Sequence, residues 1–287
     1  MNLRTGTIAA TVALTTALSA GCGTDPLDER GWVGTWAMAG SAVGVYAHGY
    51  DPIGRADGHV TFPDTACPLV ADDGTTLTIT GGCTDSTGTE WRGTATVARA
   101  ADGSRALTMD GYGRINDPAF ASTVSGTLDL HRIDASHHSF TSDLVQAGGV
   151  TVSVHYGGTV DGDYDARTTW NGSGSVSRDG IVEPTGGVRV STVDEVVDDS
   201  VCSGQPVSGT TTIQSDDHSA VVTYDGATAC DSAKAARLTY DGADAGLIEG
   251  IYCGAVAPGA TRGSAPLTAL ACFGAVAVGV VARRRRA

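Results

Sequence analysis

The sequence predicts an all-β protein: an antiparallel meander of many short strands, arranged as a sandwich or a barrel. Apolar and polar residues alternate with a period of two in several runs, most clearly in Val150–Tyr156 and Val124–Leu130, as in a strand with one buried face. Between Asp25 and Tyr252 no stretch shows a sustained apolar period of 3.6 residues, so no helix is expected there. Asp-Gly pairs, which favour tight turns, separate the runs at Asp73-Gly74, Asp102-Gly103, Asp110-Gly111, Asp179-Gly180, Asp225-Gly226 and Asp241-Gly242.

Composition and a weak internal repeat agree with this fold. The chain has 287 residues, 40 of them glycine, and only 6% are aromatic, which favours thin sheet packing over a deep helical core. One hairpin unit, with a strand glycine leading in and an Asp-Gly turn leading out, spans Trp91–Gly111 and again Val207–Gly226, and Val124–Leu128 and Trp170–Gly174 begin the same unit. We expect the strand glycines to mark bulges or positions where a large neighbour packs closely.

The N-terminal residues 1–21 have the layout of an export signal. Arg4 is followed by the mildly apolar Thr5–Leu18 and by small residues directly before Cys22. This order resembles a bacterial lipoprotein signal peptide, which implies that Cys22 is lipidated and becomes the first residue of the mature protein, with 22–30 as a tether. An ordinary secretory signal with Cys22 as a bystander also fits, and either signal exports the chain.

The C-terminal residues 265–287 predict a short membrane helix. An uncharged stretch, 265–282, precedes Arg283, Arg284, Arg285 and Arg286, a pattern typical of a helix with a cytoplasmic stop. With Cys253 and the linker 253–264, this tail resembles the sorting segments of myxobacterial surface proteins, which combine a cysteine motif, an apolar helix and an arginine cluster. The resemblance implies removal of the tail at Cys253 and a location at the outer membrane or cell surface, which we favour over the inner membrane.

The region 31–252 is the β-rich body, with a division into subdomains 31–115 and 120–252 left open. The chain carries 32 acidic and 18 basic residues, a net charge of −14. Such a surface repels nucleic acid, which we exclude as a partner. The expected partners are the membrane, through the lipid and the C-terminal helix, and a surface protein or a glycan.

Seven cysteines in an exported chain indicate an oxidising compartment. Cys67 and Cys83 flank one β-like stretch, and Cys202 and Cys230 flank another. We expect these two local disulfides, although spacing alone does not determine connectivity. A structural zinc site is not expected, because the chain has no C-x2-C pair.

Gly34-Thr35-Trp36 is expected to open the first strand. A G-x-W at this place resembles the first motif of the lipocalin family, which implies a closed barrel that carries a small ligand. The alternative is an aromatic residue that caps an ordinary first strand. The four tryptophans of the chain are better explained as core anchors than as sugar-stacking residues: Trp32, Trp36, Trp91 and Trp170.

Two groups of residues are candidates for metal binding, although no cofactor is required by the sequence. Asp161, Asp163 and Asp165 have the spacing of oxygen ligands in a calcium loop, with a solvated acidic turn as the alternative. A second group, which suits zinc or nickel or is simply a polar hairpin, contains His131, Asp134, His137 and His138, with His155 on the next strand. Consecutive His137 and His138 point to opposite faces of a strand.

Catalytic motifs are absent from the sequence. It contains no G-x-S-x-G nucleophile elbow, no P-loop and no dinucleotide-binding fingerprint. The sequence therefore favours a lipid-anchored cell-envelope protein that is not an enzyme and has a structural, adhesive or binding role. The alternatives are a lipocalin-like small-ligand carrier and a secreted hydrolase with a dispersed active site.

Overall fold

The computed structural model describes residues 25–248 except 63, 117, 119–120, 164–166, 182–183, 199, 202–205 and 226–235. Fourteen strands form one antiparallel sheet in which nearly every strand pairs with the next in the chain, in the order β1-β2-β4-β5 and onward to β14, while β3 pairs with β4. This confirms the predicted all-β antiparallel meander. The strands are β1 (Leu69–Asp72), β2 (Thr76–Thr80), β3 (Cys83–Thr84), β4 (Glu90–Arg99), β5 (Arg105–Ile115), β6 (Thr123–Arg132), β7 (His137–Ala147), β8 (Thr151–Asp163), β9 (Arg167–Asp179), β10 (Gly186–Asp198), β11 (Ser208–Gln214), β12 (Ser219–Asp225), β13 (Ala236–Tyr240) and β14 (Ala243–Leu247).

The period-two pattern of the sequence becomes the two faces of this sheet. In β7, Phe140 and Leu144 are buried whereas Thr141 and Asp143 are exposed. Burial of the apolar set on one face is the main driving force for the sheet. The tryptophans are core anchors, as predicted: Trp36, Trp91 and Trp170 are fully buried and Trp32 nearly so.

Two helices lie on the inner face of the sheet, which corrects the expectation that this region has none. A short 3-10 turn, η1 (Arg30–Trp32), leads into α1 (Val33–Gly40), which is followed by α2 (Ala42–Asp57). Every residue of α1 is buried, so the helix is apolar on all sides and shows no 3.6-residue alternation. The prediction of a strand at Gly34-Thr35-Trp36 is therefore wrong, because these residues lie in α1. The lipocalin resemblance depended on that strand and is not supported by the structure.

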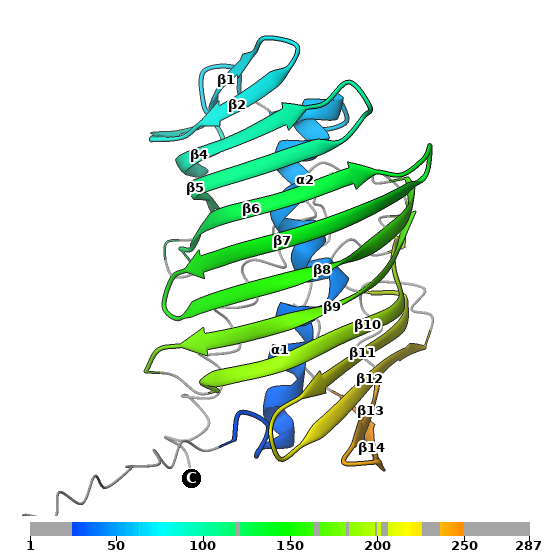
Figure 1. Cartoon of the computed structure of the whole chain (residues 1–287). Helices are drawn as coiled ribbons and strands as arrows, with labels where there is room; N and C mark the ends of the chain where they lie inside the picture. Colours follow the sequence, from blue (N-terminus) through cyan, green and yellow to red (C-terminus); the bar gives the residue numbers. More distant parts are fainter. Residues whose placement is uncertain are drawn as a thin grey trace, which may run out of the picture.

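The helices lie in line across the strands (Figure 1). Helix α1 packs on β8 to β11, and α2 continues from β10 to β4 and β5. Ser41 caps α2 by accepting a hydrogen bond from the Gly44 amide, 3.4 Å away. A Cβ on Gly40 would lie 2.5 Å from Cγ1 of Val190, so only glycine lets the end of α1 approach β10 this closely.

Four of the predicted Asp-Gly turns connect successive strands, namely Asp73-Gly74, Asp102-Gly103, Asp179-Gly180 and Asp241-Gly242. The turn expected at Asp110-Gly111 is wrong, because both residues lie within β5. Gly111 has a φ of 56° there, and the pairing register shifts between Met109 and Tyr112. A bulge and a tight turn both use a residue with positive φ. An Asp-Gly pair can therefore form a bulge within a strand as well as a turn between strands. Gly226 lies outside the described residues.

Strand glycines mark bulges and close contacts, as expected. Gly93 has a φ of 58° where the register shifts between Arg92 and Thr94. In β9, a Cβ on Gly172 would lie 2.7 Å from Cε1 of Tyr156, so this glycine makes room for an aromatic ring.

Two further predictions concern the division into subdomains and the membrane helix. The sheet is continuous across the proposed subdomain division, since β5 and β6 are hydrogen-bonded neighbours. Among the described residues no helix has the length and apolarity needed to cross a membrane. The predicted C-terminal helix, 265–287, lies outside the described residues.

Candidate functional site

Polar and charged side chains gather at the C-terminal end of α2. The helix ends at Gly58, which adopts a φ of 86°. The amide of Gly58 donates to the carbonyl of Arg55 at 3.3 Å, and that of His59 donates to the carbonyl of Gly54 at 2.8 Å. These bonds satisfy carbonyls that a helix end would otherwise leave unpaired.

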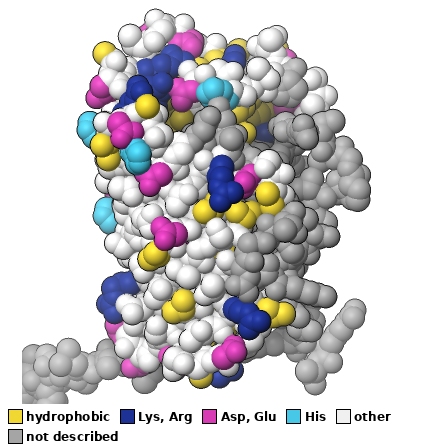
Figure 2. Space-filling model, turned by 90° about the vertical axis from the view of Figure 1, so that its right-hand side faces the viewer, with side chains coloured by type: hydrophobic (Ala, Val, Ile, Leu, Met, Phe, Trp, Pro, Cys, Tyr) yellow, Lys and Arg dark blue, Asp and Glu magenta, His cyan; other side chains and the backbone are white. Residues whose placement is uncertain are grey.

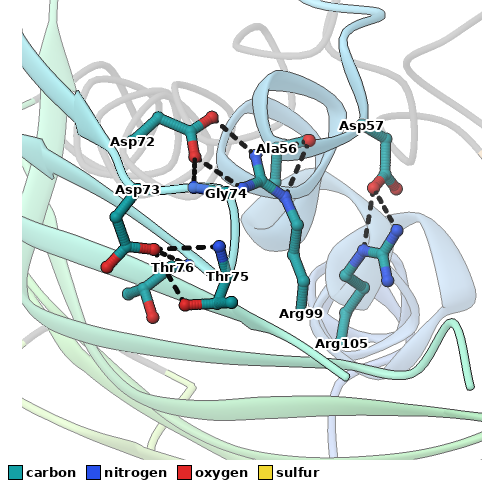
Figure 3. Close-up of polar contacts among 9 residues, drawn as sticks. All are labelled: Ala56, Asp57, Asp72, Asp73, Gly74, Thr75, Thr76, Arg99 and Arg105. Carbon is teal, nitrogen blue, oxygen red and sulfur yellow. Dashed lines mark hydrogen bonds and ion pairs between the residues drawn. The ribbon is translucent and has the colours of Figure 1, made fainter. Parts of the chain in front are cut away.

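Arg99 on β4 holds this helix end against the edge of the sheet (Figure 3). Its Nε and Nη2 donate to the carbonyl of Ala56 at 3.0 and 2.7 Å, and its Nη1 and Nη2 donate to the Asp72 carboxylate at 2.7 and 2.9 Å. The hydrogen bond from Arg99 lowers the pKa of Asp72 to about 2. A guanidinium at this place also complements the negative end of the helix dipole.

Arg105 on β5 makes a second contact with the same helix end (Figure 3). Its Nε donates to Oδ1 of Asp57 at 2.8 Å, its Nη2 lies 2.7 Å from the same oxygen, and its Nη1 donates to the carbonyl of Gly103 at 2.9 Å. The pair is only partly exposed, so this charge-assisted contact is screened less than a surface ion pair.

A cavity of about 410 Å³ lies beside this contact. The end of α2, the β4–β5 and β6–β7 turns and the end of β8 enclose it. Its floor includes Ile53, Leu130 and Val160. Its polar lining includes Asp57, His59, Arg105 and His138. A cavity of this volume, with an apolar floor and a few convergent polar groups, has the form of a small-ligand site.

His137 and His138 point to opposite sides of β7, as their consecutive positions predicted. His137 lies outside the cavity, with Nδ1 2.7 Å from Oδ1 of Asp134 and Nε2 3.7 Å from Asp161, and the hydrogen bond to Asp134 raises its pKa. His138 lines the cavity. Burial, and secondarily the charges of Arg132 and Arg105, lower its pKa, so its imidazole is neutral at neutral pH and can both donate and accept a hydrogen bond.

Figure 2, which looks onto this end of the strands, shows basic, acidic and histidine side chains gathered in its upper part. Within the predicted histidine group, His131 points away from the cavity, with Nδ1 3.2 Å from Oγ of Ser104. His155 lies in the middle of β8, opposite Asp143, so the structure does not bring it to the others.

Two further titratable groups are buried on α2 but do not line the cavity. Asp51 lies 3.6 Å from Nη1 of Arg114, and burial raises the pKa of its carboxyl in spite of this charge. His48 is buried, and desolvation lowers its pKa to about 4. Burial penalises the charged form of each group, which explains the opposite directions of the two shifts.

The predicted calcium group is described only in part. Asp161 and Asp163 form the end of β8 rather than a separate loop, and the Asp161 carboxylate faces His137. Asp165 and the side chain of Asp163 lie outside the described residues, so calcium binding here stays a prediction.

The Cys67–Cys83 disulfide is present, with the two Cα atoms 6.0 Å apart, which confirms that half of the predicted pairing. The other cysteine positions with assigned roles, Cys22, Cys202, Cys230 and Cys253, lie outside the described residues, as do the sorting arginines Arg283 to Arg286.

Of the charged and histidine side chains that line the cavity, the sequence predicted only His138 as a candidate and missed Asp57, His59 and Arg105. Asp57 and Arg105 are 48 positions apart and Ala56 and Arg99 are 43 apart, and no local pattern connects them. The Asp57-Gly58 pair is a helix stop signal, but it is informative only once α2 is recognised. Comparison with family models, curated proteins and solved structures finds no match for this chain.

Proposed function

We propose that this protein is a lipid-anchored, non-enzymatic binding protein of the cell envelope whose ligand site is the cavity at the end of α2. The observation that carries the proposal is the cavity itself, with its apolar floor and its polar lining, which includes Asp57, His59, Arg105 and His138. The export signal and the cysteine at position 22 support the extracytoplasmic, lipid-anchored part.

A small polar ligand of the size of one sugar unit suits this lining best. A neutral imidazole on His138 can exchange hydrogen bonds with a hydroxyl group, and the Asp57–Arg105 pair offers an acceptor and a donor side by side. The floor of Ile53, Leu130 and Val160 matches the apolar face that a sugar ring presents. The glycan partner expected from the sequence therefore has a specific candidate site.

The alternatives have less support. A lipocalin-like carrier needs an interior free for ligand, whereas α1 and the tryptophans occupy the middle of the inner face. A hydrolase has no recognisable catalytic motif in the sequence to support it.

Titration calorimetry of the purified protein with glucose, N-acetylglucosamine and glucuronate tests the binding role. We expect a ligand in this set to bind, and the His138→Ala variant to bind it about tenfold more weakly, since a hydrogen bond in a shielded site contributes roughly 1–1.5 kcal/mol. His137→Ala is the matched control, because the neighbouring imidazole points outside the cavity, and its affinity should equal that of the wild type. Absence of binding to all three sugars, or equal losses in both variants, would contradict the proposal.

Mass spectrometry of the protein purified from its native envelope tests the anchor. A diacylglyceryl group on Cys22, with no peptide beyond Cys253, supports a lipoprotein whose tail is a removable sorting segment. An unmodified Cys22 with residues 265–287 retained would replace the lipid anchor with an inner-membrane one.

A further inference from the structure

We propose that Asp25, Asp28 and His218 form a binding site for a divalent transition-metal ion of the zinc class. One ligand atom from each of the three side chains lies within 4.8 Å of the others. Asp25 and Asp28 belong to the segment that precedes η1, and His218 belongs to the β11–β12 turn. Because the sheet is an antiparallel meander, this turn lies at the strand ends opposite the cavity, so the site is separate from the proposed ligand site.

The orientation of His218 is the main argument for a metal. Its Nδ1 lies 2.8 Å from Oδ2 of Asp241, in the β13–β14 turn, and its Nε2 faces Oδ1 of Asp28 at 3.4 Å. A carboxylate on one ring nitrogen fixes the tautomer and directs the other nitrogen toward a metal, as in carboxylate–histidine–zinc arrangements.

The distance between His218 and Asp28 fits a shared ion better than a hydrogen bond. The 3.4 Å separation of Nε2 and Oδ1 exceeds the range of about 2.7–3.2 Å for a good N–H to O hydrogen bond. Two ligands about 2.0–2.2 Å from a tetrahedral zinc ion are themselves separated by about 3.4 Å. The two atoms are therefore placed as neighbouring corners of such a coordination sphere.

Two of the three ligands, Asp25 and His218, are also held in place by their surroundings. Oδ1 of Asp25 accepts a hydrogen bond from the Leu27 amide at 2.8 Å, and Oδ2 accepts one from the Asp217 amide at 3.3 Å. The His218 amide donates to Oγ of Ser215 at 3.1 Å, and the imidazole stacks on Tyr240 with ring centroids 5.4 Å apart. Held ligands lose little conformational entropy when an ion binds.

The donor set selects the class of ion. One imidazole nitrogen and two carboxylates suit zinc, nickel or cobalt, whereas calcium and magnesium prefer sites made only of oxygen ligands. Three protein ligands leave a fourth position for water. The competing interpretation is an imidazolium that forms ion pairs with Asp28 and Asp241 and needs no ion.

Such an ion has a structural consequence. It joins residues 25–28 to the β11–β12 turn and so fastens the segment next to position 22 to the body of the protein. That segment is already docked there, since the indole of Trp36 donates to the carbonyl of Pro26 at 2.9 Å and the hydroxyl of Tyr240 donates to the carbonyl of Leu27.

Calorimetry of the full chain with zinc chloride, and separately with calcium chloride, near neutral pH tests the site. We expect a single zinc ion to bind, calcium to bind far more weakly, and the melting temperature to rise with zinc and fall again with a chelator. Asp28→Asn and His218→Gln should each weaken zinc binding by at least about tenfold, and Asp241→Asn should weaken it by about 10–100-fold.

His137→Ala is the control, because His137 is also held between two carboxylates, Asp134 and Asp161, but at the other end of the strands. It should keep wild-type zinc affinity. Asp28 is half exposed, so we expect Asp28→Asn to fold. If His218→Gln does not fold, the zinc affinity of Asp28→Asn tests the site. No zinc binding, or zinc binding that His137→Ala abolishes and Asp28→Asn leaves intact, would overturn the proposal and leave the cluster as an ion pair.

Discussion

Helices α1 and α2 lie on the same face of the same sheet but are held there in different ways. All of α1 is buried, and the fully buried Trp36 packs it on the strands. Along α2, burial decreases toward Asp57, and the end of the helix is held by Arg99 and Arg105. Large apolar side chains fill the space between helix and sheet, whereas ion pairs fix a helix end without filling it. The cavity lies beside the ion pair that holds the end of α2.

The largest expected effect comes from the apolar contact. Trp36→Ala should lower the free energy of unfolding by about 3–5 kcal/mol, because it removes a fully buried indole and leaves the Pro26 carbonyl without its donor. Urea denaturation measures the loss. Val193→Ala, at a largely exposed side chain, should change stability by less than about 0.5 kcal/mol. Similar losses in the two variants would show that α1 is not packed as described.

The next largest expected effect is a loss of folding stability at acid pH, caused by the buried His48. His48 is buried with its pKa lowered from 6.5 to about 4, so the unfolded chain binds a proton at a higher pH than the folded protein does. Stability is therefore unaffected by this group above pH 6.5 and is lost as the pH falls toward about 4, by roughly 3 kcal/mol in total.

The His48→Gln variant isolates this contribution, because Asp51 on the same helix has a raised pKa and therefore changes stability in the opposite direction on acidification. Denaturation at a series of pH values should show that the variant loses less stability than the wild type on acidification. Parallel pH profiles for the two proteins would mean that His48 is accessible to protons in the folded state.

The smallest effect is expected at the polar contact. Arg105→Gln removes the partner of Asp57 and should lower stability by about 1 kcal/mol, because both side chains are partly solvated. Arg92→Gln is the matched control, since its pair with Glu90 is nearly half exposed, and no measurable change is expected. A loss in Arg105→Gln as large as that of Trp36→Ala would remove the distinction between the two helix contacts.

Local patterns in the sequence predict the sheet and part of the candidate site. Alternation along β7 placed His137 and His138 on opposite faces, and Asp-Gly pairs located four of the turns. The short spacing of Cys67 and Cys83 predicted their disulfide. These features depend on neighbours a few residues away, so local periodicity and turn chemistry are enough to predict them.

The helices and the two proposed sites depend instead on long-range packing. Val33–Gly40 is surrounded by apolar partners, so its sequence carries no amphipathic signal. Asp57 meets Arg105 from 48 positions away, and Asp25 meets Asp217 from 192 positions away. Contacts over such separations arise because the helices and the segment before them pack across many strands of the sheet, an arrangement that no stretch of sequence encodes locally.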